Sequence, residues 1–241
     1  MFTLPELKGH DKARELRKER LSNGTSNHGW LTAVVFARPS SEFVSKHMLP
    51  HLGYWDARSA LKTHFYYAGF SNESKRALEE VALDVPGFSQ KWFYSDFLFN
   101  EDRRQLQHNT TWQYGGGLEL LLLNTHHNNL DTRSQYEPPV NYSSVLCCRL
   151  DNMLKDGAIH SVEQFFESIF SFSERTFAED PVWGFSDKRA IEIGGSALKR
   201  AVLSLLPKLI AEEYAKAEHF AVRDLVQKSL RPKKRHSPKS A

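Results

Sequence analysis

Residues 30–37 read WLTAVVFA, and this stretch decides the class of fold that the sequence predicts. It is nearly continuous in apolar residues and contains β-branched side chains, which is typical of a strand buried at the centre of a sheet. Arg38 and Pro39 end the strand. Ser40 or Ser41 follows as the expected N-cap of a helix, because a hydroxyl accepts hydrogen bonds from the free amides of a first helical turn.

Strand and helix patterns continue outward from this first strand. Three further strands are expected at 64–70, 118–123 and 143–150. Helices are expected at about 41–60, 73–82, 96–108 and 161–176, with Pro50 dividing the first of them. The helices at 73–82 and 96–108 both fall between the second and third strands and count as one helical connection, so the predicted order is strand, helix, strand, helix, strand, strand, helix. A helical crossover favours parallel pairing of the first two strands, and the last two strands can pair antiparallel.

This order of elements is the one that a thioredoxin-like core has, so we expect an α/β domain with a four-stranded mixed sheet. This expectation is based only on the order of the predicted strands and helices, since no sequence motif supports a family resemblance. A redox thioredoxin would carry its cysteine pair just after the first strand, where this chain has RPSSEF at 38–43. Cys147 and Cys148 are adjacent in a predicted strand, where neighbouring side chains point to opposite faces. We therefore expect two reduced, buried thiols and no redox chemistry.

The chain of 241 residues divides into four predicted parts. The α/β core lies between a charged N-terminal helix with its linker and a C-terminal helical extension, and a disordered basic tail comes last. Pro207 should bend the long helical tract of the extension, which is expected from about 187 to 229. In chain order the four parts span residues 1–29, 30–176, 177–230 and 231–241.

The basic charge of the protein is concentrated in the tail. The whole chain has a formal charge of +3, but without the tail 27 basic residues face 29 acidic ones. A body that binds duplex nucleic acid would more often be basic itself. One alternative function is nevertheless a nucleic-acid-associated protein that uses the tail as a phosphate tether. Its binding residues would be Arg231, Lys233, Lys234, Arg235 and Lys239.

One polar loop offers candidate catalytic residues. His126 and His127, followed by Asp131, could hold a metal or supply a general base, which gives a hydrolytic or metal-assisted enzyme as a second alternative. Paired histidines in a loop are more often solvated, so no catalytic residue is assigned. His47 and His51 have a spacing that zinc sites use, but local sequence places no third ligand. The sequence therefore predicts neither a metal nor a cofactor.

Two short runs have ordinary structural explanations. Gly115-Gly116-Gly117 invites comparison with a phosphate-binding loop, but such a loop follows a strand, whereas this run precedes one. We favour a backbone turn that needs a positive φ angle. The run Glu101-Asp102-Arg103-Arg104 indicates a salt-bridged helix face with little role beyond solubility.

The binding surface is predicted from the expected sheet. Ligands of open α/β sheets bind beyond the carboxyl ends of the parallel strands. If the third strand runs antiparallel to the first, the loop at 112–117 approaches residues 38–41. Clustered Trp and Tyr residues near loops also favour partner interfaces. The candidate binding residues are Arg38, Ser40, Ser41, Trp112 and Tyr114.

The leading functional hypothesis is a non-enzymatic protein-interaction module, or a subunit of an intracellular assembly, whose partner is another protein. A composition of 40% hydrophobic and 25% charged residues excludes a wholly disordered chain, a collagen-like fibre and a disulfide scaffold. The longest aliphatic run is Leu120–Leu123, far short of the ~20 apolar residues of a membrane span. Charge near the N-terminus stands where a signal peptide would be apolar. We therefore expect a cytoplasmic protein without membrane contact.

Overall fold

The computed structural model describes several stretches of the chain, and every structural statement below concerns these residues. They are 30–42, 44–59, 63–71, 80–83, 91–125, 140–179, 197–215 and 221–225. The N-terminal helix predicted within 1–29 and the basic tail at 231–241 lie outside them.

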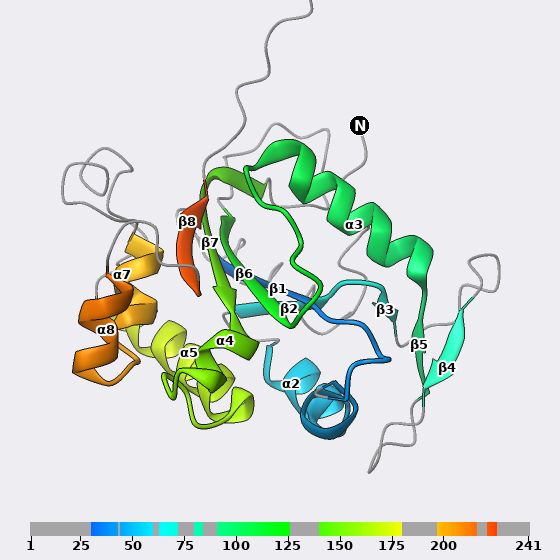
Figure 1. Ribbon diagram of the computed structural model, residues 1–241, viewed down its shortest axis with the longest axis horizontal. Coiled ribbons are helices and arrows are strands. Elements are labelled where there is room, and N and C mark those ends of the chain that lie inside the picture. Colours follow the sequence, from blue (N-terminus) through cyan, green and yellow to red (C-terminus); the bar gives the residue numbers. More distant parts are fainter. Residues whose placement is uncertain are drawn as a thin grey trace, which may run out of the picture.

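A mixed five-stranded sheet forms the centre of the fold, so the α/β class is confirmed (Figure 1). Its order is β2-β1-β6-β7-β8. Strands β1 and β2 pair in parallel, as predicted, and every other pair is antiparallel. The strands are β1 (Trp30–Phe36), β2 (Thr63–Tyr67), β6 (Glu119–Thr125), β7 (Val140–Arg149) and β8 (Val222–Leu225).

Strand β1 is the buried strand that its composition predicts. Each residue from Leu31 to Phe36 is at most 1% exposed, because β1 has a neighbouring strand on both sides and helices over both faces. Phe36 packs against Phe99 of one helix, with ring centroids 5.5 Å apart. On the opposite face, Phe65 of β2 lies 4.8 Å from Phe166 of another helix.

The helices form two layers around this sheet. Figure 1 shows α3 (Asp96–Asn109) on one side and α2 (Leu52–Ser59), α4 (Leu150–Lys155) and α5 (Val162–Glu179) on the other. The predicted helices at 96–108 and 161–176 are thus confirmed as α3 and α5. Proline divides the first predicted helix, since a π-helix at Val44–Met48 and a 3-10 turn at Leu49–His51 precede α2. None of the helices in the described ranges has the length and apolarity that crossing a membrane requires.

The expected strand at 64–70 is divided between two sheets. After β2 the chain turns at Gly69, whose φ is +82°, and continues as β3 (Phe70–Ser71). A Cβ on Gly69 would lie 2.8 Å from Cβ of Phe99, so only glycine fits this turn. Strand β3 belongs to a second, three-stranded antiparallel sheet.

The prediction of a helix at 73–82 is wrong for its last two residues. Val81 and Ala82 lie in β4 (Val81–Leu83), which pairs with β5 (Trp92–Tyr94) in the order β3-β5-β4. Pairing with β5 gives the backbone of β4 the hydrogen bonds that a helix would make locally. Residues 72–79, which carry the rest of this prediction, lie outside the described residues.

The prediction of a single long helical tract from about 187 to 229 is also wrong. The described residues contain α7 (Ala197–Leu203) and α8 (Lys208–Tyr214), and Pro207 is the N-cap residue of α8 and so separates the two helices rather than bending one. Residues 222–225 form β8, which pairs antiparallel with β7 at its outer edge. This pairing satisfies the edge of β7 and makes the main sheet five-stranded instead of the expected four-stranded.

Candidate functional site

The end of β1 lies beside the beginning of β6. The two strands pair antiparallel, with Phe36 opposite Glu119, so the condition set from the sequence is met. The glycine loop, residues 112–117, precedes β6, and its Trp112 ring lies 4.5 Å from the Phe36 ring. This pairing brings the glycine loop to the residues that follow β1.

Phe99 of α3 links the two loops. The guanidinium of Arg38 stands 4.9 Å from the centre of the Phe99 ring, which is within the range of a cation–π contact. The Tyr114 ring meets Phe99 edge-on at 5.4 Å. Two of the predicted binding residues, Arg38 and Tyr114, therefore pack on one aromatic side chain.

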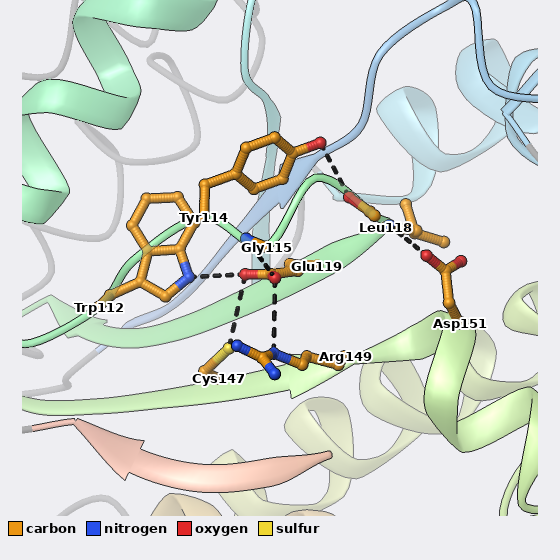
Figure 2. A network of polar contacts seen from close by, with 9 residues as sticks. Trp112, Tyr114, Gly115, Leu118, Glu119, Cys147, Arg149 and Asp151 are labelled. Atoms are coloured by element: carbon orange, nitrogen blue, oxygen red, sulfur yellow. Dashed lines mark hydrogen bonds and ion pairs between the residues drawn. The ribbon is translucent and has the colours of Figure 1, made fainter. Parts of the chain in front are cut away.

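A buried carboxylate anchors the glycine loop from below (Figure 2). Glu119 is 2% exposed, and its two oxygens accept hydrogen bonds from Trp112 Nε1 at 2.7 Å and from the Gly115 amide at 2.9 Å. Arg149 Nε lies 3.5 Å from Glu119 Oε1, and the Cys147 thiol contacts the other oxygen. A buried charge is stable only when it is paired and hydrogen-bonded, so these contacts hold the loop in one position.

Each glycine of the loop occupies a position where another residue would clash or would strain the backbone. A Cβ on Gly115 would lie 2.7 Å from Oε1 of Glu119, and a Cβ on Gly117 would meet Asp151, which accepts the Leu118 amide at 2.7 Å. Gly116 has open space around it but a φ of +92°. The turn with a positive φ is confirmed at Gly116, and the carboxylate of Glu119 occupies the Gly115 amide that a phosphate would need.

Trp112 and Tyr114 differ in what they can contact. Trp112 is fully buried, so this predicted binding residue supports the loop and does not face a ligand. Tyr114 is partly buried and donates to the carbonyl of Gly117 at 2.9 Å. Burial, and secondarily the charge of Glu119, raise the pKa of Tyr114 to about 12, so the phenol stays protonated at neutral pH.

Arg38 begins a tight turn on the other side of the surface. Its Nη1 donates to Asp96 Oδ1 at 2.7 Å, and the Tyr94 hydroxyl donates to the same oxygen at 3.1 Å. Burial, and then the charge of Asp96, raise the pKa of Tyr94 well above its ordinary value. The Ser41 amide donates to the Arg38 carbonyl at 3.0 Å, and Ser40 is exposed at the tip of this turn.

The other sequence candidates are not part of this surface. His126, His127 and Asp131 lie outside the described residues, as do Arg231, Lys233, Lys234, Arg235 and Lys239, so these remain predictions. His47 and His51 instead share Glu163 of α5, at 3.5 and 3.8 Å. Across the described ranges, no group of three or more His, Cys, Asp or Glu side chains is arranged to hold a metal.

The two cysteines are free and buried, as expected. Burial raises the pKa of the Cys147 thiol to about 12, and the Glu119 charge adds to the shift. Burial also raises the pKa of Cys148. Both thiols therefore stay protonated at neutral pH, and neither is an activated nucleophile.

Sequence reasoning missed the residues that shape the surface from below and from α3. Glu119 is a lone acid in the apolar run at 118–123, and a single charge in a predicted buried strand is a signal that could have identified it. Of the paired arginines of α3, Arg104 makes the predicted salt bridge, to Glu101 at 2.7 Å. The buried Nε of Arg103 has no hydrogen-bond partner within the described part of the chain, and no local signal distinguishes Arg103 from Arg104.

Comparison with protein family models, with curated proteins and with solved structures gives no match to this chain. We define the β1-end surface as the turn at 38–41, the glycine loop at 112–117 and the adjoining face of α3 from Phe99 to Arg103.

Proposed function

We propose that this chain is a non-enzymatic protein-interaction module, a subunit of a cytoplasmic assembly, and that the β1-end surface binds its partner. The proposal rests on a difference in solvent exposure: the outer residues of this surface are exposed, whereas the carboxylate beneath the glycine loop is buried. Ser40, Gln113, Gly115 and Gly116 are exposed, whereas the carboxylate that holds the glycine loop is 2% exposed. A loop fixed before binding loses little conformational entropy when a partner docks, which favours affinity.

The chemistry of the surface suits recognition. Arg38 and Tyr114 combine a charged or polar group with a large apolar area, and such residues are enriched at protein interfaces. The phenols of Tyr94 and Tyr114 stay protonated near neutral pH, and each already donates its one proton, Tyr94 to Asp96 and Tyr114 to the Gly117 carbonyl. They therefore offer a partner an acceptor oxygen and are not poised as general bases. Asp96, the acid beside them, is engaged by Arg38 and by the Tyr94 hydroxyl.

We also infer that strands β2-β1-β6-β7 form a thioredoxin-like core to which β8 is added. The support is the strand order, with a parallel pair followed by two antiparallel strands, together with α3 before β6 and α5 after β7. In this architecture the place of a redox cysteine pair is taken by the turn at 38–41. We therefore place the binding surface at the position where a redox-active thioredoxin carries its catalytic cysteines.

Native mass spectrometry of the full chain, isolated gently from its source cells, tests the proposed function. We expect a second polypeptide in stoichiometric amount. Ser40→Tyr places a bulky side chain on the exposed turn without disturbing the core and should remove most of that partner. Ser204→Tyr makes the same change at an exposed position after α7, so it should leave the partner bound.

Two results would contradict the proposal. The first is a bare monomer in the wild-type preparation. The second is a partner that Ser40→Tyr retains as fully as Ser204→Tyr does, because such a partner binds elsewhere on the molecule.

A further inference from the structure

We propose that Arg103 binds a carboxylate that the partner protein presents to the α3 side of the β1-end surface. This inference rests on the proposed function for the source of the carboxylate, but the site itself is defined by the geometry of α3 and the glycine loop.

Arg103 lies between two contacts of α3 with the glycine loop. Phe99, one helical turn earlier, packs on Tyr114 at 5.4 Å. Gln107, one turn later, donates from its Nε2 to Gln113 Oε1 at 2.6 Å. Residues four apart share a helix face, so Arg103 lies on the face of α3 that runs along the loop.

One nitrogen of the Arg103 guanidinium has no hydrogen-bond partner among the described residues. This nitrogen is Nε, which is buried. Buried polar groups nearly always have a partner from the protein, from water or from a ligand. The guanidinium fork matches the two oxygens of a carboxylate, which makes a carboxylate the fitting ligand for the position.

The neighbouring acids are engaged by other groups. Asp96 is paired with Arg38 at 2.7 Å, and Glu101 is paired with Arg104 at the same distance. Glu119 is held beneath the loop, and the adjacent Asp102 is buried and accepts from Tyr66 at 2.8 Å.

The positive charge of the surface also acts on Tyr114. Arg38 and Arg103 both lower the pKa of this phenol, against the larger effect of burial and the opposing charges of Glu119 and Asp151. Both guanidinium groups are therefore close enough to the Tyr114 hydroxyl for their charges to act on it.

A protein carboxylate fits these observations better than a nucleic acid. Binding to a nucleic-acid backbone needs a row of basic residues that contact several phosphates. In its described residues the surface instead offers one arginine, Arg103, whose Nε has no hydrogen-bond partner, and a second arginine, Arg38, that is already paired with Asp96. The chain outside its tail is slightly acidic, with 27 basic and 29 acidic residues.

The test uses the full chain labelled with ¹⁵N and four acetylated tripeptide probes. One probe has a free C-terminal carboxylate, one is its C-terminal amide, one is amidated with a central Glu, and one is amidated with a central phosphoserine. We expect saturable shifts of the Arg103 Nε–Hε signal with at least one carboxylate probe and none with the neutral amide. Arg103→Gln should weaken binding, read from the loop amides, by about tenfold or more.

Arg104→Gln is the matched control, because it removes the same charge from the next residue, which is exposed and paired with Glu101. It should change the affinity less than about twofold. An equal loss in Arg103→Gln and Arg104→Gln would overturn the proposal, as would equal binding of the neutral amide or no saturable shift with any carboxylate. Binding of the phosphoserine probe alone would also overturn it, in favour of a phosphate site.

The same variants separate this inference from the proposed function. If the native partner binds Arg103→Gln as tightly as the wild type, the carboxylate site is wrong and the interaction module stands. If the carboxylate probes bind at Arg103 but no partner polypeptide is found, the site stands and the proposed function is wrong.

Discussion

Glu119 is the residue on which the shape of the candidate surface depends. Its carboxylate is 2% exposed and holds the Trp112 indole, the Gly115 amide and the Arg149 guanidinium together. The predicted residues Arg38, Ser40 and Ser41 were found from their place after β1; Ser40 is exposed, and the other two are partly buried. Glu119 was not found, because its role depends on an indole and an arginine that arrive from a loop and from another strand.

We expect Glu119→Gln to lower the free energy of unfolding by about 2–3 kcal/mol. An amide keeps the shape but presents an NH₂ group to a donor, and it leaves Arg149 without its counter-charge. Urea unfolding followed by circular dichroism measures the change. Glu101→Gln removes an acid from the exposed pair with Arg104 and should cost less than ~0.5 kcal/mol. Equal losses in the two variants would contradict a structural role for the buried carboxylate.

The Cys147 thiol predicts how stability depends on alkaline pH. The unfolded chain releases this proton near pH 9, whereas burial first, and then the Glu119 charge, raise the pKa of the folded thiol to about 12. The unfolded state therefore binds fewer protons above pH 9, and the contribution of Cys147 to stability is lost as the pH rises from 9 to 12. The loss should be about 1.4 kcal/mol per pH unit.

Comparing wild type with Cys147→Ala isolates this contribution, since both proteins keep Cys148 and the tyrosines. The difference between their free energies of unfolding should be constant below pH 8 and should fall above pH 9. A difference that stays constant to pH 11 would show that the folded thiol ionises as readily as an unfolded one.

At the scale of the element, the apolar periodicity of the sequence predicted those helices and strands that form from their own residues. The strand at 30–36 and the helices α3 and α5 have long, consistent apolar periodicity, and all three are present. Strands β4 and β8 have only three and four residues and depend on pairing with β5 and β7. A pairing of this kind is a tertiary property, and a sequence window of a few residues does not contain it.

The dependence of β8 on β7 leads to a prediction for backbone protection. The Arg149 amide donates to the Ala221 carbonyl, so the alternation of an antiparallel pair makes Cys147 and Arg223 the next hydrogen-bonded pair. Arg223→Pro removes a β8 amide that faces β7 and should break the pairing, so the amides of Val145 and Cys147 should exchange with deuterium at least tenfold faster. Arg223→Ala keeps the backbone amide and loses the same side chain, so it should retain most of the protection. Exchange followed by mass spectrometry or NMR compares the two. Equal protection in both variants would show that β7 does not need β8.

At the scale of the whole molecule, two kinds of charge are separated along the chain. The chain before residue 231 is slightly acidic, and the basic surplus belongs to the tail. The candidate surface, in contrast, has Arg38 over the Phe99 ring and Arg103 one helical turn after Phe99 in α3. The interaction module and the nucleic-acid hypothesis therefore use different parts of the protein, and deleting one part does not remove the other.

Deletion of residues 231–241 tests the nucleic-acid alternative. If the tail tethers phosphates, binding of the full chain to duplex DNA should weaken steeply with salt. Its logarithmic slope should be no steeper than about −4.5 for five basic residues. The truncated chain should then lose this binding and keep its protein partner, as fluorescence anisotropy and native mass spectrometry would show. DNA binding that survives the deletion would place the contact on the folded body.

The hydrogen bond from the Trp112 indole to the Glu119 carboxylate joins two residues that are only seven positions apart in the chain. The first and last residues of the loop's anchor therefore lie on one short segment, which Arg149 and Asp151 support from β7 and α4. The exposed Gln113, between Trp112 and Glu119, makes no contact with Glu119 among the described hydrogen bonds. Substitution can alter what the crest of the loop recognises without unfolding its base. Such a separation gives the surface freedom to acquire new partners over evolutionary time while the fold that carries it stays unchanged.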